Sequence, residues 1–381
     1  MASQSSHDQY MQMCLDLANK ASGQTSPNPL VGAVVLDCEG NIVGQGYHER
    51  AGMPHAEPVA LAVAGTKARG GTIYVNLEPC CHHGRTPPCA DALIASGIKS
   101  VIVGTGDPFD KVQGGGLAKL RAAGISVTVG VMERECRYIN RGFFKSVQKG
   151  LPWLELKLAA TLDGRIADCD GLSRYVTSQK ALEYVQKLRS EVDCIIVGAR
   201  TARLDNPKLT VRMPDNSDSE RQPLRAVIDP YLTTRPDSEL ARGGKTILYC
   251  LNESLGDAKH FDSDSIEIVP VSCIEGTIAK LSLTAVMQDL NKRGMRRVLS
   301  EGGGVLAGGL LDEDLVDQLY WFVAPKLLAD QAASPAVAST ERRCLPDAIM
   351  LEDLAVESYH PDFLFTALIS GRAAFIHDSQ S

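Results

Sequence analysis

His55-Ala56-Glu57 and Pro79-Cys80, followed further along by Cys89, are the segments that decide how this 381-residue sequence is interpreted. An imidazole and two thiolates are ligand types that bind Zn²⁺ tetrahedrally, and three protein ligands leave a fourth position for water. The apolar periodicity predicts a helix from Ala56 to about Lys67. Glu57 therefore stands at a helix start, two residues after the histidine, where it can face a metal without binding it.

A His-x-Glu motif followed by Pro-Cys and a second cysteine is the pattern of zinc deaminases. Zinc lowers the pKa of its water to about 7, and the resulting hydroxide attacks a ring carbon that bears an exocyclic amine. Glu57 takes the water's proton and returns it to the ring nitrogen and the leaving amine. The alternative is a structural zinc site closed by four ligands, for which Cys81, His82 or His83 could supply the fourth.

Composition and charge limit the class of protein. A hydrophobic share of 44% and a charged share of 22% are ordinary for a soluble globular chain. The net charge is −7 overall, with 14 basic against 12 acidic residues (+2) in the first 150. Neither part has the basic excess of a protein that neutralises a phosphate backbone, so we expect a small polar substrate and no nucleic acid. No segment approaches 18 uninterrupted apolar residues, and we expect no membrane contact.

The eleven cysteines are odd in number and scattered, which excludes a complete disulfide framework. The first twenty residues lack a basic stretch followed by an apolar run, so no signal peptide is expected. Reduced cysteines in a cytoplasmic enzyme are the simplest interpretation.

Strand and helix patterns alternate and restart near residue 150, which predicts two α/β domains. In the first, Ser6 and Gln9 have capping-box spacing and predict a helix start. An opening hairpin followed by parallel crossovers is expected there. The predicted strands are 31–36, 42–46, 72–76, 101–104 and 127–129, then 154–158, 194–197, 226–229, 247–250, 266–269 and 298–300. Further helices are predicted at 89–96, 117–123, 178–189, 283–292 and 305–311, and exposed loops at 213–222 and 252–265.

In the second domain the best site is Glu301-Gly302-Gly303-Gly304, because a glycine turn at a helix start presents free N–H groups to a phosphate. The third glycine of a dinucleotide fingerprint is missing, since Ala307 stands there. Arg189 and Arg212 could fork onto a substrate phosphate. Lys157 is a candidate for stabilising charge that develops on a carbonyl oxygen.

The run Pro79-Cys80-Cys81-His82-His83-Gly84-Arg85-Thr86-Pro87-Pro88-Cys89, with its long Cys-x8-Cys spacing, closely resembles the deaminase motif of the bifunctional riboflavin-biosynthesis deaminase/reductase family. Thr25-Ser26-Pro27-Asn28-Pro29-Leu30-Val31-Gly32 and Gly46-Tyr47-His48 are similar to that family too, and the resemblance extends over nearly the whole chain. It implies a cytidine-deaminase-like three-layer α/β domain over residues 1–148 and a dihydrofolate-reductase-like α/β domain over 149–375.

The resemblance also implies site residues. In the first domain it implies His55, Cys80 and Cys89 as zinc ligands, Glu57 as the proton shuttle, and Asn28, His48, His82 and Arg85 as substrate contacts. Cys81 stands where the family is expected to have serine. In the second domain it implies NADPH contacts at Ala159, Tyr175, Thr201, Asp205, Gly303, Gly304, Val305, Leu306, Ala307, Gly308 and Gly309. Substrate contacts are expected at Lys157, Ser173, Arg189, Leu209, Arg212 and Glu301.

We therefore expect two consecutive steps of riboflavin synthesis: zinc-dependent hydrolytic deamination of a diaminopyrimidine ribosyl phosphate, then NADPH-dependent reduction of its ribosyl group to ribityl. The family makes a homo-oligomer an expectation, although no interface can be derived from the sequence. One alternative is a nucleoside or RNA deaminase with an inactive C-terminal half. The other is a zinc-stabilised binding module without turnover, which chelation would unfold.

Overall fold

The computed structural model describes residues 4–81, 87–109, 112–173, 176–215, 217–242, 244–261, 264–274 and 280–376. These residues form two compact units. One comprises the described residues up to Gly150 together with those from Ala374 onward, and the other is Leu151–Ala373. Within the described part of the chain, none of the helices has the length and apolar character needed to cross a membrane.

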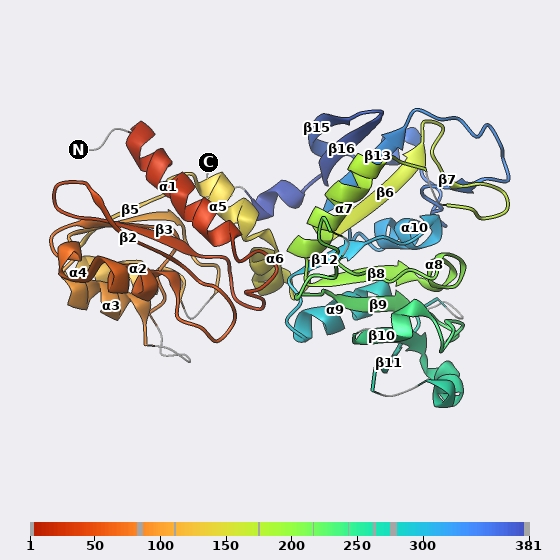
Figure 1. The fold of residues 1–381 in the computed structure, drawn as a ribbon, viewed down its shortest axis with the longest axis horizontal. Coiled ribbons are helices and arrows are strands. Elements are labelled where there is room, and N and C mark those ends of the chain that lie inside the picture. Colours follow the sequence, from red (N-terminus) through yellow and green to blue (C-terminus); the bar gives the residue numbers. More distant parts are fainter. Residues whose placement is uncertain are drawn as a thin grey trace. The chain divides into compact units, whose positions relative to one another are not determined.

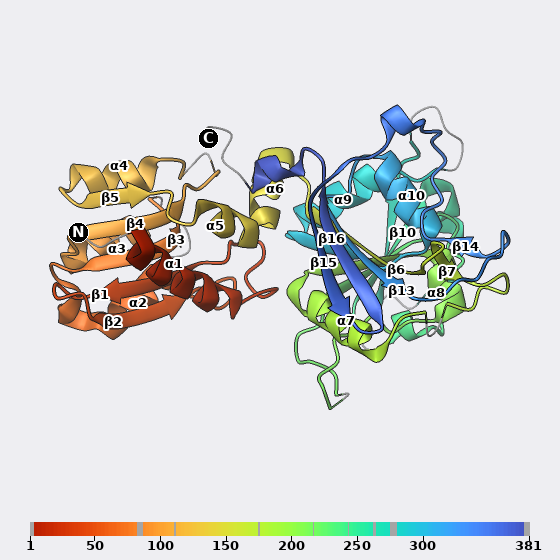
Figure 2. The same ribbon diagram turned by 90° about the horizontal axis from the view of Figure 1, so that it is seen from above.

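The first unit is built on a five-stranded sheet of order β2-β1-β3-β4-β5 (Figure 2). β1 pairs antiparallel with β2 and β3, whereas β3, β4 and β5 are parallel. The predicted hairpin followed by parallel crossovers is thus confirmed. The strands are β1 Gly32–Leu36, β2 Ile42–Tyr47, β3 Thr72–Leu77, β4 Ser100–Thr105 and β5 Ser126–Val129.

Helices cover both faces of this sheet and make a three-layer unit (Figure 1). Successive side chains of β1 point to opposite faces of the sheet. Ala33 and Val35 pack in a core with one set of helices, and Val34 and Leu36 pack in a second core with the other set. The first set is α2 Ala56–Ala64, α3 Cys89–Ser96 and α4 Gly115–Ala122; the second is α1 Gln4–Asn19 and α5 Glu133–Ile139. The 3₁₀ turn Gly65–Ala68 extends α2, and α6 Arg141–Lys149 ends the unit's main segment.

One helix start was predicted wrongly. α1 already includes Gln4, so Ser6 lies inside the helix and does not cap it. Gln4 and Ser5 precede Ser6 in the helix, and a four-residue spacing alone did not distinguish a helix start from a position within the first turns.

The second unit contains a nine-stranded sheet of order β11-β10-β9-β8-β12-β6-β13-β16-β15 (Figure 1). Neighbouring strands are parallel from β11 to β13. β16 pairs antiparallel with both of its neighbours, β13 and β15. The strands are β6 Trp153–Thr161, β8 Cys194–Gly198, β9 Leu224–Ile228, β10 Thr246–Leu251, β11 Ile266–Val271, β12 Arg297–Ser300, β13 Gln318–Ala324, β15 Leu351–Tyr359 and β16 Asp362–Ile369. A separate two-stranded sheet joins β7 Arg165–Ala167 to β14 Ser334–Pro335.

Two apolar cores lie on the two faces of the large sheet. α9 Leu283–Lys292 and α10 Gly304–Asp312 pack on one face, and α7 Gln179–Glu191 and α8 Ala199–Asp205 on the other. The stretch 252–265 was predicted to be a loop, but its first nine residues, Asn252–His260, form a 3₁₀ helix. Other short 3₁₀ turns are Glu239–Ala241, Leu345–Asp347 and Arg372–Phe375. The strands β13, β15 and β16 were absent from the sequence-based assignment.

Candidate active sites

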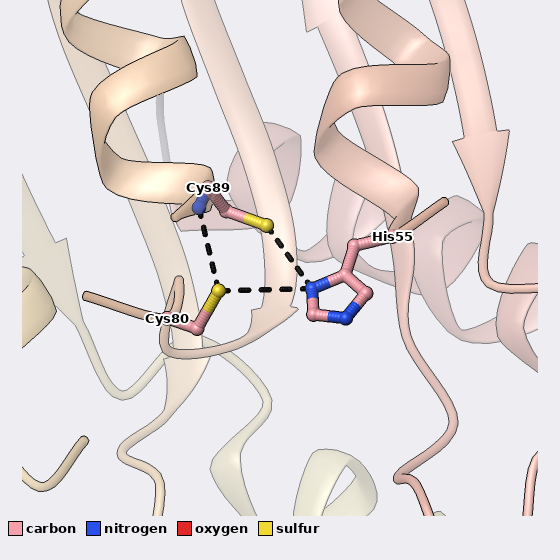
Figure 3. Close-up of side chains that lie close together, drawn as sticks. All are labelled: His55, Cys80 and Cys89. Atoms are coloured by element: carbon pink, nitrogen blue, oxygen red, sulfur yellow. Dashed lines mark hydrogen bonds between the residues drawn. The ribbon is translucent and has the colours of Figure 1, made fainter. Parts of the chain in front are cut away.

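A histidine and two cysteines converge in the first unit (Figure 3). His55 is the residue that precedes α2, Cys80 follows β3, and Cys89 is the first residue of α3. Nδ1 of His55 lies 3.2 Å from Sγ of Cys89 and 3.7 Å from Sγ of Cys80. All three potential ligand atoms lie within 4.8 Å of one another.

These distances fit a zinc ion. Zn–S bonds of about 2.3 Å and Zn–N bonds of about 2.0–2.1 Å at tetrahedral angles would separate sulfur from nitrogen by about 3.6 Å. The backbone N–H of Cys89, at the start of α3, donates to Sγ of Cys80 at 3.3 Å. A hydrogen bond from the Cys89 thiol chiefly lowers the pKa of Cys80, against the opposing effect of burial; hydrogen bonds from His55 and from this backbone N–H add to the lowering and favour the thiolate form. Two sulfurs and one nitrogen leave one tetrahedral position free, as a catalytic zinc requires.

Glu57 lies beside this triad. It is 3% exposed, in the first turn of α2, and its carboxyl is in hydrogen-bonding contact with the Cys89 thiol. Burial raises the pKa of Glu57 above its ordinary value. A carboxyl whose pKa is raised toward neutrality can both take up and release a proton, which suits an acid–base residue.

Two of the predicted substrate contacts, Asn28 and His48, reach the same place. Nδ1 of His48 donates to the carbonyl of Pro54 at 3.0 Å, so Nε2 is left to accept from the Asn28 amide at 3.1 Å. Burial lowers the pKa of His48, which keeps the ring neutral and this arrangement intact. The His48 and His55 rings meet edge to face with centroids 5.4 Å apart. Asn28 and His48 therefore belong to the surroundings of the triad.

The remaining predictions for this unit have different outcomes. His82 and Arg85 lie outside the described residues. Cys81 is partly buried and lies close to Gly115, and it is not a member of the cluster formed by His55, Cys80 and Cys89. Among the described residues, the structure thus brings together the three ligands that the family pattern implies.

Sequence reasoning missed two buried carboxylates next to the triad. Glu78 accepts hydrogen bonds from four backbone N–H groups, those of Asp107, Gly114, Gly116 and Leu117. Burial raises the pKa of Asp107 to about 7, and the charges of Glu78 and Cys80 act in the same direction. Glu78 directly follows β3 and Asp107 is the second residue after β4, at the sheet edge where site residues collect, and that position was the sequence signal available.

In the second unit, Lys157, Arg189 and Glu301 form a charged cluster. Glu301 follows β12 and Lys157 lies on the neighbouring strand β6, while Arg189 comes from α7. Nε of Arg189 donates to Glu301 at 2.6 Å and Nη2 donates to its other carboxylate oxygen at 3.0 Å. Burial lowers the pKa of Lys157, and the charge of Glu301 opposes that effect.

Arg189 was expected to fork onto a substrate phosphate. In the structure its fork donates to Glu301 and its Nη1 donates to the carbonyl of Thr210 at 3.0 Å, and its contact with a phosphate stays a prediction. Arg212, the other predicted phosphate ligand, is exposed, and its backbone N–H donates to Gln186 at 2.9 Å. Leu209 is buried and has a left-handed φ of 53°, so only its backbone is suited to a ligand.

Two of the predicted cofactor residues, Thr201 and Gly303, meet near the starts of α8 and α10. The N–H of Gly303, which precedes α10, donates to Oγ1 of Thr201 at 3.2 Å. Oγ of Ser173 donates to Asp205 at 2.7 Å, so a predicted substrate contact and a predicted cofactor contact are neighbours. Ala159 lies partly buried on β6, and Tyr175 lies outside the described residues.

The glycine-rich run of α10 has a mixed character. Leu306, Ala307 and Gly308 are buried, whereas Val305 is 71% exposed. A Cβ on Gly304 would overlap the carbonyl oxygen of Pro335, and one on Gly308 that of Ala338. The N–H of Ala338 also donates to the carbonyl of Gly304 at 2.9 Å. Close packing of residues 335–339 therefore accounts for Gly304 and Gly308 without any cofactor.

Comparisons with known proteins agree with this division of the chain. Residues 4–105 match the family model described as the cytidine and deoxycytidylate deaminase zinc-binding region, and residues 152–365 match the RibD C-terminal domain. The chain is 39% identical to riboflavin biosynthesis protein RibD of Synechocystis over 365 residues, 95% of this chain and 96% of that protein. The chain belongs to the RibD family.

Other RibD relatives are similar over comparable lengths. The chain is 41% identical to the RibD of Escherichia coli over 85% of this chain and 89% of that protein. A Thermotoga maritima structure described as a diaminohydroxyphosphoribosylaminopyrimidine deaminase/5-amino-6-(5-phosphoribosylamino)uracil reductase superposes with a TM-score of 0.85 at 32% identity, over 96% of this chain and 99% of that one. Both expected fold classes are confirmed, and this RibD-family chain is a bifunctional enzyme of riboflavin biosynthesis that uses zinc and NADPH.

Proposed function

We propose that the first unit hydrolyses the 2-amino group of 2,5-diamino-6-(5-phosphoribosylamino)pyrimidin-4(3H)-one, and that the second reduces the ribosyl group of 5-amino-6-(5-phosphoribosylamino)uracil to ribityl. The observation that carries the proposal is the His55, Cys80 and Cys89 triad with Glu57 buried beside it. That donor set fits a three-ligand zinc, and the acid is placed to exchange protons with a molecule in the fourth position.

We assign the steps of deamination to residues of the first unit. When bound by the triad, zinc supplies a Lewis acid that makes a water acidic near neutral pH. Glu57 accepts a proton from the attacking water at its carboxylate and passes it to the pyrimidine ring nitrogen and then to the leaving amine, so that water and the amidine give a carbonyl and ammonia. Asn28 and neutral His48 are proposed to hold the pyrimidine edge, because their side chains pair with each other and the His48 ring lies against the ring of His55.

In the second unit NADPH supplies the hydride when bound. Lys157 is proposed to donate to the oxygen of the ribosyl carbonyl as negative charge develops on it. The Arg189–Glu301 pair fixes the charged environment of Lys157, since Glu301 faces both cations. Arg212 is the exposed cation left for the substrate phosphate. Thr201, Asp205 and Gly303 are proposed to meet the cofactor.

A product assay tests the two assignments together. Zinc-loaded protein is incubated with the diaminopyrimidine ribosyl phosphate, with and without NADPH, and the products are followed by mass spectrometry. We expect the deaminated species to accumulate without NADPH and the ribityl product to form with it. Absence of both products would overturn the substrate assignment, whereas deamination without NADPH-dependent reduction would overturn only the second half.

We also propose that the protein is a homo-oligomer. β15 is an edge strand of the large sheet, and its side chains Leu351, Leu354 and Val356 are 41%, 61% and 53% exposed. A long apolar edge strand is a liability unless another chain covers it. Light scattering after gel filtration should give a multiple of 40.9 kDa, and Leu354→Lys should reduce it to the single-chain mass. We propose a cytoplasmic location because none of the eleven cysteines, all of them in the described part of the chain, forms a disulfide bond.

A further inference from the structure

Two buried asparagines hold the backbone of Leu30 in the first unit. Oδ1 of Asn140 accepts from the N–H of Leu30 at 2.7 Å, and Nδ2 of Asn140 donates to the carbonyl of Leu30 at 2.9 Å. Nδ2 of Asn76 donates to that same carbonyl at 2.9 Å, and its Oδ1 accepts from the N–H of Gly32 at 2.8 Å. Asn76 is 0% and Asn140 2% exposed.

A neutral amide offers both the donor and the acceptor that these contacts need. Each asparagine faces a backbone donor with its oxygen and a backbone acceptor with its nitrogen, and a carboxylate or a hydroxyl cannot present both groups in that geometry. In a buried site an amide that loses its partners also leaves backbone polar groups unsatisfied. The side-chain identity at 76 and 140 is therefore tied to the position of the Leu30 peptide.

The backbone of Leu30 lies close to the backbone of Asn28 and His48, the two proposed substrate contacts. Asn28 is two residues before Leu30, in a turn closed by its N–H donating to the carbonyl of Thr25 at 2.8 Å. The N–H of His48 donates to the carbonyl of Val31 at 2.9 Å, next to Leu30. Asn28 and His48 thus start from the same short, fixed stretch of backbone, and their side chains meet at 3.1 Å.

The path then continues to the metal ligands. His48 donates to the carbonyl of Pro54, the residue directly before His55. Asn140 lies between α5 and α6, outside the residues 4–105 that match the zinc-binding region. A contact path therefore runs from the α5–α6 junction to the triad through the loop that bears Asn28.

We propose that Asn76 and Asn140 are positioning residues of the deaminase: they fix the Leu30 peptide and through it hold Asn28 and His48 in register with the substrate's pyrimidine. This inference rests on the proposed function, because it takes Asn28 and His48 as substrate contacts. Neither asparagine touches the triad in the contacts described, so the effect acts on substrate placement and not on zinc.

The test uses the full-length zinc-loaded protein and the isosteric change Asn140→Asp, which puts an oxygen against the Leu30 carbonyl. We expect KM for deamination to rise about tenfold or more, with kcat reduced less, zinc content unchanged, and the reductase rate on pre-deaminated substrate unchanged. Asn19→Asp makes the same substitution at an exposed position of α1 and is expected to leave all four quantities unaltered. Asn140→Ala removes the amide without adding a buried charge and is expected to raise KM as well.

Every other outcome decides against the proposal. An unchanged KM in a folded, zinc-loaded Asn140→Asp or Asn140→Ala protein overturns it. Loss of zinc in both variants with intact reductase also overturns it, because the amide would then hold the whole unit and not the loop. Asn28→Ala separates this inference from its premise. A normal KM in Asn28→Ala refutes the proposed substrate contact, whereas a raised KM there with a normal KM in Asn140→Asp refutes the positioning role alone.

Discussion

The two sites of this chain are built from different kinds of parts. The proposed deaminase site combines three side chains whose chemical type is set by a metal with neighbours from short segments, and its residues lie around positions 28, 48, 55–57, 80 and 89. The proposed reductase contacts are spread over residues 157–309, and they include strand ends, helix starts and a backbone N–H group, that of Gly303, as well as side chains. Residue type is visible in a sequence, but the position of a backbone group is not. The first site is therefore much easier to predict than the second.

Removal of zinc should separate the two sites most strongly. We expect dialysis against a chelator to abolish deamination, because His55, Cys80 and Cys89 would have no ion to present water. NADPH-dependent reduction of pre-deaminated substrate should continue at its original rate. Stopped assays of both activities on the same sample, with zinc added back as the control, check this. Loss of both activities would contradict the independence of the two sites.

Glu57→Gln should have the next largest effect. The amide cannot accept a proton, and we expect deamination to fall by about 10³-fold or more while zinc stays bound. Zinc content by mass spectrometry and the deamination rate measure the two consequences separately. A variant that still deaminates at the original rate would falsify the assigned shuttle.

Much of the first site could be predicted, and the reasons are specific. The triad, Glu57 and α3 Cys89–Ser96 follow from residue type and helix periodicity. Glu78 and Asp107 did not emerge because their roles depend on the backbone N–H groups and neighbours that surround them. In the second site, Arg189 has the chemistry of a phosphate ligand, and only the fold shows that Glu301 occupies it. β13, β15 and β16 were missed at sequence level, although they complete one side of the large sheet.

Glu301→Gln tests the second site directly. The change leaves the Arg189 guanidinium without its carboxylate and removes the charge that faces Lys157. We expect the reductase rate to fall by about 10²-fold because an interaction made to charged groups in a buried site is lost. Deamination should be unaffected. Asp237→Asn, which breaks the exposed pair with Arg235, is the matched control and should change neither activity.

The pH dependence of stability offers a smaller effect with a definite sign. Burial alone would raise the pKa of Glu301, but the charge of Arg189 and its hydrogen bonds outweigh burial, so the pKa lies below the ordinary 4.5. The pair therefore stabilises the second unit fully above about pH 4.5 and loses its effect as pH falls through the lowered value. The difference in Tm between the original protein and Glu301→Gln should narrow over that acid range. A constant difference down to pH 3 would contradict the linkage.

Cys81→Ser should have the smallest effect and sharpens the ligand assignment. Because Cys81 is not part of the triad's cluster, we expect zinc content and deamination to stay within about twofold of the original. Cys80→Ser, the adjacent control, should lose zinc. If Cys81→Ser lost the metal, a four-ligand structural site would replace the catalytic interpretation.

The packing of residues 335–339 against α10 has a consequence for how this enzyme can change. Gly304 and Gly308 are held to glycine by the neighbouring carbonyls of Pro335 and Ala338, whatever cofactor the site binds. A change of nicotinamide preference, in evolution or by engineering, therefore cannot use substitutions at these two positions. Val305, which is exposed on the same helix, can be substituted without such an overlap. Invariance at Gly304 and Gly308 would then reflect the packing of the fold, whereas invariance elsewhere on α10 would reflect binding of the cofactor.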